Sequence, residues 1–437
     1  MDGIVEYLKS PSLVAKIQLY FGVFPKKVLH DKCELNGLTK SLSTLQSKSA
    51  CNIHNRVGNQ CSGVVSNGRS DSEGLIGTES KQDCPETDVD DETVSSESET
   101  EASDYVVTKL FWHYLFIVGT ALGDEIFYAS FIPFWFWNID GAVGRRVVLV
   151  WAIIMYIGQS IKDVVRWPRP SYPAIRLQKK WAQEYGMPST HAMVGVSIPF
   201  SVILYTMNRY QYSVALGLIV AVVWCTVICV SRLYLGMHSV LDIVVGLMLA
   251  IALMFPVVPI VDTLDHYLLT NKWSPGFVML VSILVMVFYP SSDRWTPTRG
   301  DTTIVVSVST GILIGAWLNY QLGNLYESSL SPPYTIIWPS YEMLGLATLR
   351  TAIGFCCLIA TRAVGKSASY ATVCALLRLS SKEIRESQYS IENKQKIFVE
   401  ISYKYITYFL MGINTAYLLP NVFRLIGIER PTFYTEI

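Results

Sequence analysis

From residue 106 onward the chain consists of apolar runs of about 20 residues, separated by short polar loops. A helix of that length crosses the hydrocarbon core of a bilayer, and these runs are continuous rather than alternating, so they predict helices and not barrel strands. We therefore expect an all-α, polytopic transmembrane helical bundle with about nine spans. The expected spans are 110–138, 146–165, 191–207, 213–231, 239–259, 275–290, 302–320, 341–361 and 400–426.

The first 105 residues follow a different pattern. Ser10-Pro11 is typical of a helix start, and the apolar positions from Leu13 to Phe24 recur at helical spacing. Residues 1–30 thus predict an amphipathic helix that either lies on a membrane surface or packs on the rest of the protein. Residues 31–105 are rich in Ser and acidic residues and poor in large apolar ones, so we expect this acidic tail to be disordered.

Composition agrees with a membrane protein. Apolar residues make up 51% of the chain and charged residues only 16%, against roughly 25% in soluble proteins. The net charge is zero, so bulk charge points to neither a nucleic acid nor an anionic surface as partner. The apolar runs make membrane lipids the expected partners. The sequence has nine cysteines, an odd number, and none of them forms a CxxC pair. We therefore expect no disulfide framework.

Three polar clusters interrupt the apolar pattern, at 162–170, 188–191 and 231–242. The first ends the second expected span, the second opens the third, and the last joins the fourth to the fifth. Following the chain back and forth through a bilayer brings all three clusters to one membrane face. The segment 106–260 is therefore the expected catalytic core, and 261–437 supplies further transmembrane helices.

The charges of these clusters predict a phosphate site. Lys162, Arg169 and Arg232 lie at a low-dielectric boundary, where uncompensated cations are costly and favour a bound anion. The planar fork of Arg matches phosphate oxygens two at a time. His191 and His238 each begin a helix, whose free N–H groups also favour an anion.

The two histidines suggest the reaction. His238 and Asp242 are four residues apart and share a helix face, so Asp242 can accept the Nδ1 proton and leave Nε2 free to attack phosphorus. His191 is then the expected general acid and base. The sequence shows no cluster with metal-ligand spacing, so we expect neither a metal nor another cofactor.

The clusters resemble the type 2 phosphatidic acid phosphatase superfamily, whose pattern is K-x6-RP, PSGH and SR-x5-H-x3-D. This resemblance implies that Lys162, Arg169, Arg232, Ser189 and Thr190 bind phosphate and that a phosphohistidine forms on His238. Thr190 departs from the pattern, because the superfamily usually has Gly there, and this leaves open whether its backbone amide contacts phosphate.

The stretches 123–125, 167–170, 187–193 and 231–236 are similar to sphingosine-1-phosphate phosphatases, and the long N-terminal region favours the first isoform. That similarity implies a multi-pass enzyme of the endoplasmic reticulum, acting on sphingosine 1-phosphate and related long-chain base 1-phosphates. The alternatives are another phosphomonoester, such as phosphatidic acid, lysophosphatidic acid or glucose 6-phosphate, or transport of a lipid phosphate without turnover.

Asp124 and Glu125 form an acidic pair within the first expected span. Acids inside a span indicate a function by default, here hydrogen bonding to the cations of the site or contact with the amine of a sphingoid base. A structural pairing with a neighbouring helix is the alternative. Either interpretation makes the pair a candidate for contacting substrate or supporting the catalytic residues.

Two features of the sequence give opposite indications of which side of the membrane carries the catalytic face. The segment 362–398 lies on the expected catalytic face and carries seven Lys and Arg residues, which would place that face in the cytosol. The family resemblance implies a lumenal site instead. Giving the resemblance more weight, we expect either that 365–380 is re-entrant or that the span count is wrong by one.

Overall fold

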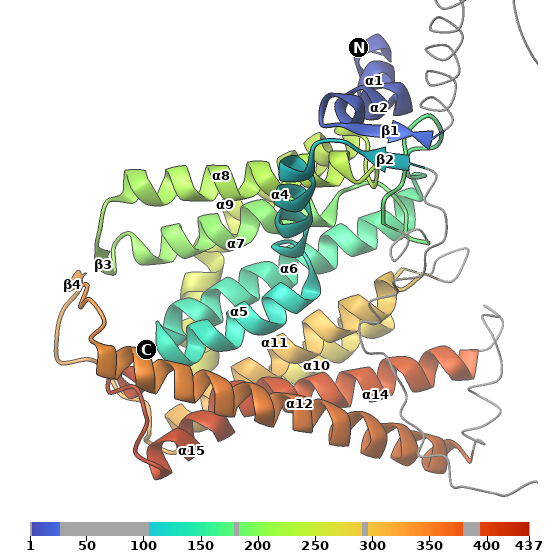
Figure 1. Cartoon of the computed structure of the whole chain (residues 1–437). Helices are drawn as coiled ribbons and strands as arrows, with labels where there is room; N and C mark the ends of the chain where they lie inside the picture. Colours follow the sequence, from blue (N-terminus) through green and yellow to red (C-terminus); the bar gives the residue numbers. More distant parts are fainter. Residues whose placement is uncertain (1, 27–104, 179–182, 291–295, 379–393, 437) are drawn as a thin grey trace, which may run out of the picture. The chain divides into compact units, whose positions relative to one another are not determined.

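A computed structural model describes residues 2–26, 105–178, 183–290, 296–378 and 394–436. The acidic tail expected to be disordered lies outside these residues, except for Tyr105. The helices, shown in Figure 1, are α1 (Asp2–Lys9), α2 (Pro11–Tyr20), α4 (Leu110–Ala121), α5 (Glu125–Asn138), α6 (Gly141–Val165), α7 (Thr190–Thr206), α8 (Val214–Tyr234), α9 (Val240–Thr270), α10 (Ser274–Val287), α11 (Thr298–Gln321), α12 (Tyr341–Leu377), α14 (Lys394–Ile413), the π-helix Asn414–Leu418, α15 (Leu419–Leu425) and the short 3-10 helix Phe433–Thr435.

The strands are very short, so the fold is almost entirely helical. They are β1 (Val23–Pro25), β2 (Tyr105–Val107), β3 (Tyr210–Gln211) and β4 (Tyr334–Thr335). β3 and β4 pair in parallel, with Tyr210 opposite Tyr334. The all-α class predicted from the apolar runs is confirmed.

Polar residues at the helix starts fix where several helices begin. Ser213 and Ser340 accept hydrogen bonds from the backbone amides three residues ahead, which satisfies donors that the first turn leaves free. The Ser239 hydroxyl likewise accepts from the Asp242 amide, and the Ser239 amide donates to the Asp242 carboxylate, so the two residues form a capping box. α2 begins at Pro11, as the Ser10-Pro11 sequence predicts.

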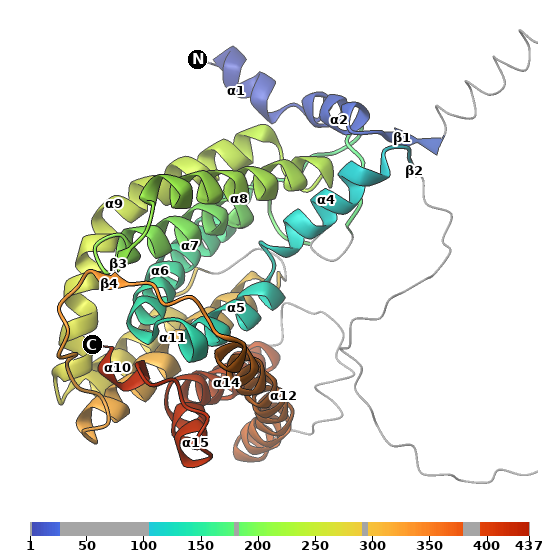
Figure 2. The ribbon, with the colours of Figure 1, turned by 60° about the vertical axis from the view of Figure 1, so that its left-hand side comes forward.

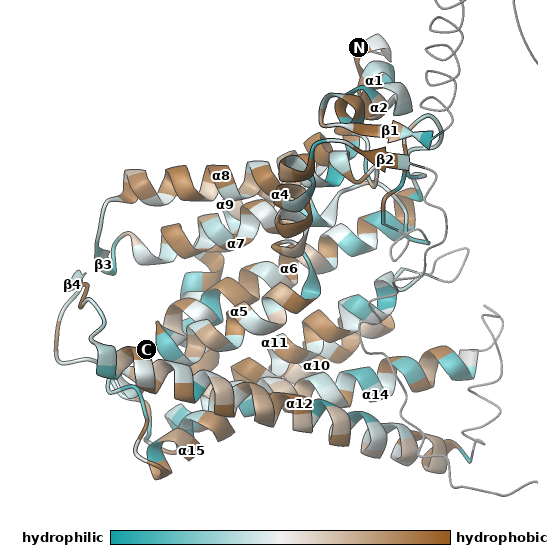
Figure 3. Cartoon of the chain, in the orientation of Figure 1, coloured by the Kyte–Doolittle hydropathy of each residue, from teal (hydrophilic) through white to brown (hydrophobic). Residues whose placement is uncertain are grey.

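Helices α6, α7, α8 and α9 pack side by side in both ribbon views (Figures 1 and 2). The most apolar stretches of α6 and α11 are 61% and 67% buried, whereas those of α8, α9 and α12 are only 22%, 22% and 17% buried. Figure 3 shows hydrophobic colour along α8, which carries exposed apolar side chains such as Leu216 and Ile219. Such continuous exposed apolar surface is suited to lipid rather than to water. The protein is therefore a multi-pass membrane protein, with α6 and α11 at its centre.

The expected count of nine spans is not confirmed. Five helices among the described residues are long and apolar enough to cross a membrane, namely α6, α8, α9, α11 and α12. The bent pair α4 and α5 would make a sixth span. One reason for the difference is length: α7 and α10 are apolar but have only 17 and 14 residues. The other is polarity: α14 begins with charged residues and is not among the helices apolar enough to cross a membrane.

The re-entrant segment expected at 365–380 is not found in its described part, residues 365–378, because α12 continues as one helix to Leu377. Arg362 and Lys366 lower the local hydropathy without ending the helix. α12 packs along α14, where Gly365 lies against Thr407. Packing on a neighbouring helix, rather than apolar character alone, thus determines how far α12 extends.

The first expected span is broken. α4 and α5 meet at a bend of 61° between Ala121 and Glu125. Asp124 lies in this break with an extended backbone, just before α5. The break places an acidic side chain at the end of two short helices instead of in the middle of a long one.

Candidate active site

The three polar clusters come together. Lys162, on the last turn of α6, donates from Nζ to the Thr190 hydroxyl at the start of α7, at 3.3 Å. The backbone amide of Ser189 donates to the Asp242 carbonyl on the first turn of α9, at 3.1 Å. These contacts join the first cluster to the second and the second to the third.

Arg169 completes the set by joining the first cluster to the third. Its Nη1 donates to the Met237 carbonyl at 2.9 Å and lies 3.4 Å from Nε2 of His238. The guanidinium is almost fully buried. The predicted meeting of the three clusters is therefore present in the structure, with Arg169 directly beside the expected nucleophile.

Glu184 is a member of this cluster that the sequence interpretation missed. One carboxylate oxygen, Oε2, accepts from Lys162 Nζ at 2.8 Å and from Arg169 Nη2 at 3.3 Å, and the Glu184 carbonyl accepts from Arg169 Nε at 3.0 Å. Burial alone would raise the pKa of Glu184, but Lys162 and Arg169 outweigh it and hold that pKa below its usual range. Glu184 lies in a loop without periodicity, so only its position five residues before Ser189 could have drawn attention to it.

Part of the Arg232 guanidinium has no hydrogen-bond partner among the described residues. Its Nη1 donates to the Thr120 hydroxyl at 2.6 Å and to Gln178 Oε1 at 3.2 Å. Within the described part of the chain, its Nε and Nη2 atoms are buried and find no hydrogen-bond partner, and the same holds for the Ser189 hydroxyl. Ser189 precedes α7 yet its side chain does not cap that helix. Buried donors without partners are costly, and an anion would satisfy them.

His238 is 1% exposed and lies in the turn between α8 and α9. Its Nδ1 is 3.8 Å from Asp242 Oδ2, which is beyond hydrogen-bond distance. That oxygen accepts from the Ser239 amide at 2.7 Å instead. Among the described residues His238 Nδ1 and Asp242 Oδ1 have no hydrogen-bond partner, so the bond expected between the two side chains is not formed in this structure, although both are in place for it.

The ionisation state of His238 suits a nucleophile. Burial, followed by the charges of Arg169 and Arg232, holds the pKa of His238 well below its usual range. The imidazole is therefore neutral near pH 7. A neutral ring keeps the lone pair that an attack on phosphorus requires.

The second histidine also has a carboxylate partner. His191 Nε2 and Asp124 Oδ1 are 2.9 Å apart, and Asp124 reaches His191 from the break between α4 and α5. This is the structural pairing with a neighbouring helix that the sequence allowed, and it also places Asp124 against a catalytic candidate. Glu125 lies on the first turn of α5 with an exposed side chain.

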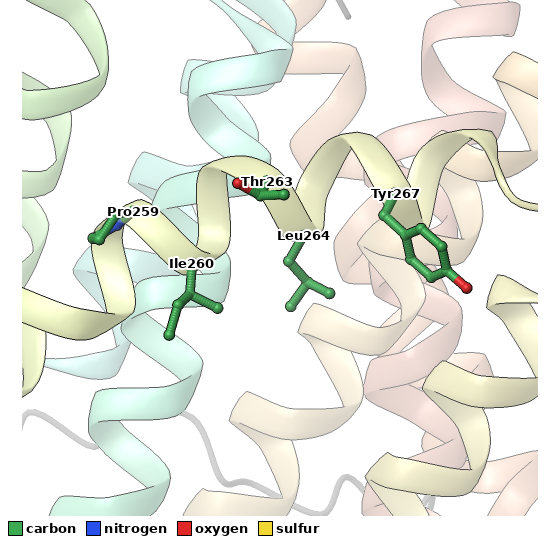
Figure 4. Close-up of a pocket in the computed structure, with 5 residues that line it drawn as sticks. All are labelled: Pro259, Ile260, Thr263, Leu264 and Tyr267. Atoms are coloured by element: carbon green, nitrogen blue, oxygen red, sulfur yellow. The ribbon is translucent and has the colours of Figure 1, made fainter.

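No group of three or more His, Cys, Asp or Glu side chains in the described ranges is arranged to hold a metal ion. A hollow on the surface lies elsewhere, on the C-terminal half of α9 (Figure 4). Asp242 is on the first turn of that helix, 17 residues before Pro259. The hollow is thus separate from the phosphate cluster, and it is lined by Pro259, Ile260, Thr263, Leu264 and Tyr267.

Comparison with known proteins supports this picture. The model of the PAP2 superfamily matches residues 144–265, which include all three clusters. Sphingosine-1-phosphate phosphatase 1 of Mus musculus is 38% identical over 330 residues, covering 74% of this chain and 74% of the relative. Sphingosine-1-phosphate phosphatase 2 of the same organism is 38% identical over 336 residues, covering 76% of this chain and 92% of the relative.

A more distant relative is lipid phosphate phosphatase delta of Arabidopsis thaliana, which is 32% identical over 205 residues, or 45% of this chain and 49% of the relative. The equal identity to isoforms 1 and 2 does not separate them, so the expected first isoform is not assigned. No solved structure matches the chain at a significant level.

Proposed function

The chain belongs to the sphingosine-1-phosphate phosphatases of the PAP2 superfamily and is a phosphoric monoester hydrolase of membranes, and we propose that it acts on sphingosine 1-phosphate and related long-chain base 1-phosphates through a phosphohistidine, without a metal. The names of its relatives support the choice of substrate. A lipid substrate also agrees with a site at the ends of apolar helices.

The contact between Arg169 and His238 is the observation that supports this mechanism most strongly. It brings a phosphate-binding cation within 3.4 Å of a neutral imidazole nitrogen. The same cluster contains buried donors of Arg232 and Ser189 that have no hydrogen-bond partner in the described part of the chain. A phosphoryl group bound here would satisfy these donors and would meet Nε2 of His238 at the same time.

The first chemical step transfers the phosphoryl group to the enzyme. Nε2 of His238 attacks phosphorus with its lone pair, a P–N bond forms, and the P–O bond to the long-chain base breaks. His191 donates a proton to the departing oxygen, which leaves as the alcohol. Lys162, Arg169 and Arg232 stabilise the charge that develops on the phosphoryl oxygens.

The second step regenerates the enzyme. His191, now neutral, accepts a proton from water while the water oxygen attacks phosphorus and the P–N bond breaks. Inorganic phosphate leaves and His238 is again a neutral imidazole. Asp124 holds the His191 ring throughout. His238 keeps its Nδ1 proton, and the Asp242 carboxylate stabilises the positive ring of the phosphohistidine until the P–N bond breaks.

Phosphate release by the purified protein in detergent tests the proposed activity. The panel contains sphingosine 1-phosphate, its dihydro form, phosphatidic acid, lysophosphatidic acid and glucose 6-phosphate, each with no added metal and with EDTA. We expect the long-chain base phosphates to be cleaved fastest, with no effect of EDTA and inhibition by vanadate. Faster cleavage of another substrate, or loss of activity with EDTA, would refute the corresponding part of the proposal.

For the cellular location we propose the endoplasmic reticulum membrane, with the phosphate site facing the lumen. The family resemblance supports this orientation, whereas the positive charges of 362–398 favour the opposite one. A glycosylation acceptor sequence inserted in the exposed segment around Ser171 should be modified if that face is lumenal. An unmodified insertion in a protein that still releases phosphate would place the site in the cytosol.

A further inference from the structure

Gln18 connects the N-terminal helix α2 to the candidate active site. Its side chain is buried, with 1% exposure. Nε2 donates to the Ile175 carbonyl at 2.7 Å and to the Tyr234 carbonyl at 2.9 Å, and Oε1 accepts from the Ile175 amide at 2.9 Å. Three hydrogen bonds use most of the capacity of one amide side chain. They join segments 157 and 216 residues away in sequence.

Both partners of Gln18 belong to backbone that carries site residues. Tyr234 is the last residue of α8, two positions after Arg232, and its carbonyl is one that the helix itself cannot satisfy. Ile175 lies in the loop that follows Arg169. The same two segments meet again where the Leu177 amide donates to the Leu235 carbonyl at 3.1 Å.

The turn that follows α8 lies so close to Ile175 and Gln18 that it requires a glycine, Gly236. Gly236 has a φ of +66°, a region that favours glycine. A Cβ atom here would collide with the Ile175 carbonyl oxygen and would lie 3.0 Å from Gln18 Nε2. The turn after α8 therefore lies directly against the Ile175 carbonyl and the Gln18 side chain.

The two segments that Gln18 joins each supply an acceptor to a cation of the site. Gln178 accepts from Arg232, and the Met237 carbonyl accepts from Arg169. A shift of either segment would move the corresponding guanidinium. The N-terminal helices make a second contact with the first cluster, because Lys9 Nζ lies 5.5 Å from the ring centre of Trp167.

We propose that Gln18 is a positioning residue for the phosphatase reaction, and that α2 forms part of the catalytic unit. Gln18 holds the loop after Arg169 against the turn that leads to His238, so that Arg232 and Arg169 keep the orientation needed to bind the phosphoryl group. This inference rests on the proposed function. It gives the N-terminal helix a role that an association with the membrane surface would not explain.

Replacing Gln18 by Leu tests the inference, because Leu has a similar size but makes none of the three hydrogen bonds. The matched control is Lys16→Gln, at an exposed position on the same helix. We expect Gln18→Leu to lower kcat/KM for sphingosine 1-phosphate at least about tenfold and to weaken vanadate inhibition by a similar factor. A tenfold loss corresponds to roughly one lost hydrogen bond between the site and the phosphate. The control should match the wild type.

Vanadate inhibition separates positioning from stability when it is measured well below the unfolding temperature of each variant. A lower unfolding temperature with unchanged kcat/KM and unchanged vanadate inhibition would overturn the inference. If Gln18→Leu does not fold, Gln18→Asn, which keeps the amide but cannot reach both carbonyls, should show the same kinetic losses. A wild-type protein that releases no phosphate would instead refute the proposed function itself.

Discussion

Nη1 of Arg169 lies 3.4 Å from Nε2 of His238, although 69 residues separate them. Two anchors hold the arginine in this place. Glu184 receives hydrogen bonds from Nε and Nη2, and the Met237 carbonyl receives one from Nη1. The guanidinium therefore presents its remaining N–H groups beside the nucleophile, where a phosphoryl group must bind if His238 is to attack it.

Replacing His238 by Ala should abolish turnover, because the substitution removes the atom that attacks phosphorus. Phosphate release from sphingosine 1-phosphate measures the effect. His266→Ala is the matched control, since His266 is exposed near the far end of α9. If the His238 variant kept more than a few per cent of the wild-type rate, the assigned nucleophile would be wrong.

Arg169→Lys should lower kcat/KM by about a hundredfold or more, because an ammonium cannot replace a planar fork that contacts Glu184, Met237 and the phosphate together. The control is Arg166→Lys, three residues earlier in the chain at an exposed position just after α6, which should lose less than about threefold. A loss of less than about threefold in Arg169→Lys as well would show that only the positive charge at position 169 matters.

Glu184→Gln keeps the size of the side chain but removes its charge. Lys162 and Arg169 then lose a buried counter-ion, which costs about 3 kcal/mol or more when one partner of a buried pair is removed. We expect a lower unfolding temperature and at least a tenfold loss of kcat/KM. Glu327→Gln, at an exposed position, should change neither. Stronger vanadate inhibition in Glu184→Gln would instead show that Glu184 competes with phosphate for the two cations.

The low pKa of His238 predicts how stability depends on pH. The folded protein keeps His238 neutral, whereas the unfolded chain protonates it below about pH 6.5. Unfolded chains therefore bind more protons, and the free energy of unfolding falls as pH drops below 6.5, by up to about 1.4 kcal/mol per pH unit until the folded pKa is reached. The unfolding temperature should fall less between pH 7.5 and 5.5 in His238→Asn than in the wild type or in His266→Asn. An unchanged pH dependence would contradict this expectation.

The residues with the clearest sequence signals are those that lie in the three clusters. Lys162, Arg169 and His238 stand out because cations and imidazoles recur in three clusters, at ends of expected spans that fall on one membrane face. Glu184, Gln18 and Thr120 carry no such signal. Each is a single polar residue in a loop or on a helix, and only the tertiary contacts give it a partner.

The helices were predictable where length and hydropathy agree, as in α6 and α8. The sequence could not show that α12 continues past Arg362, because packing against α14 stabilises a stretch that hydropathy alone would end. It also could not show the bend at Asp124, since the contact with His191 that accompanies the bend comes from a distant segment. Local patterns thus predict apolar segments well and their ends less well.

A structure of the protein with bound vanadate, a mimic of the pentacoordinate transition state, tests most directly whether three distant segments hold one phosphoryl group. We expect vanadium within bonding distance of His238 Nε2 and its oxygens in contact with Arg169, Arg232 and Lys162. Vanadate bound away from His238, or held by only one of the three segments, would contradict the account.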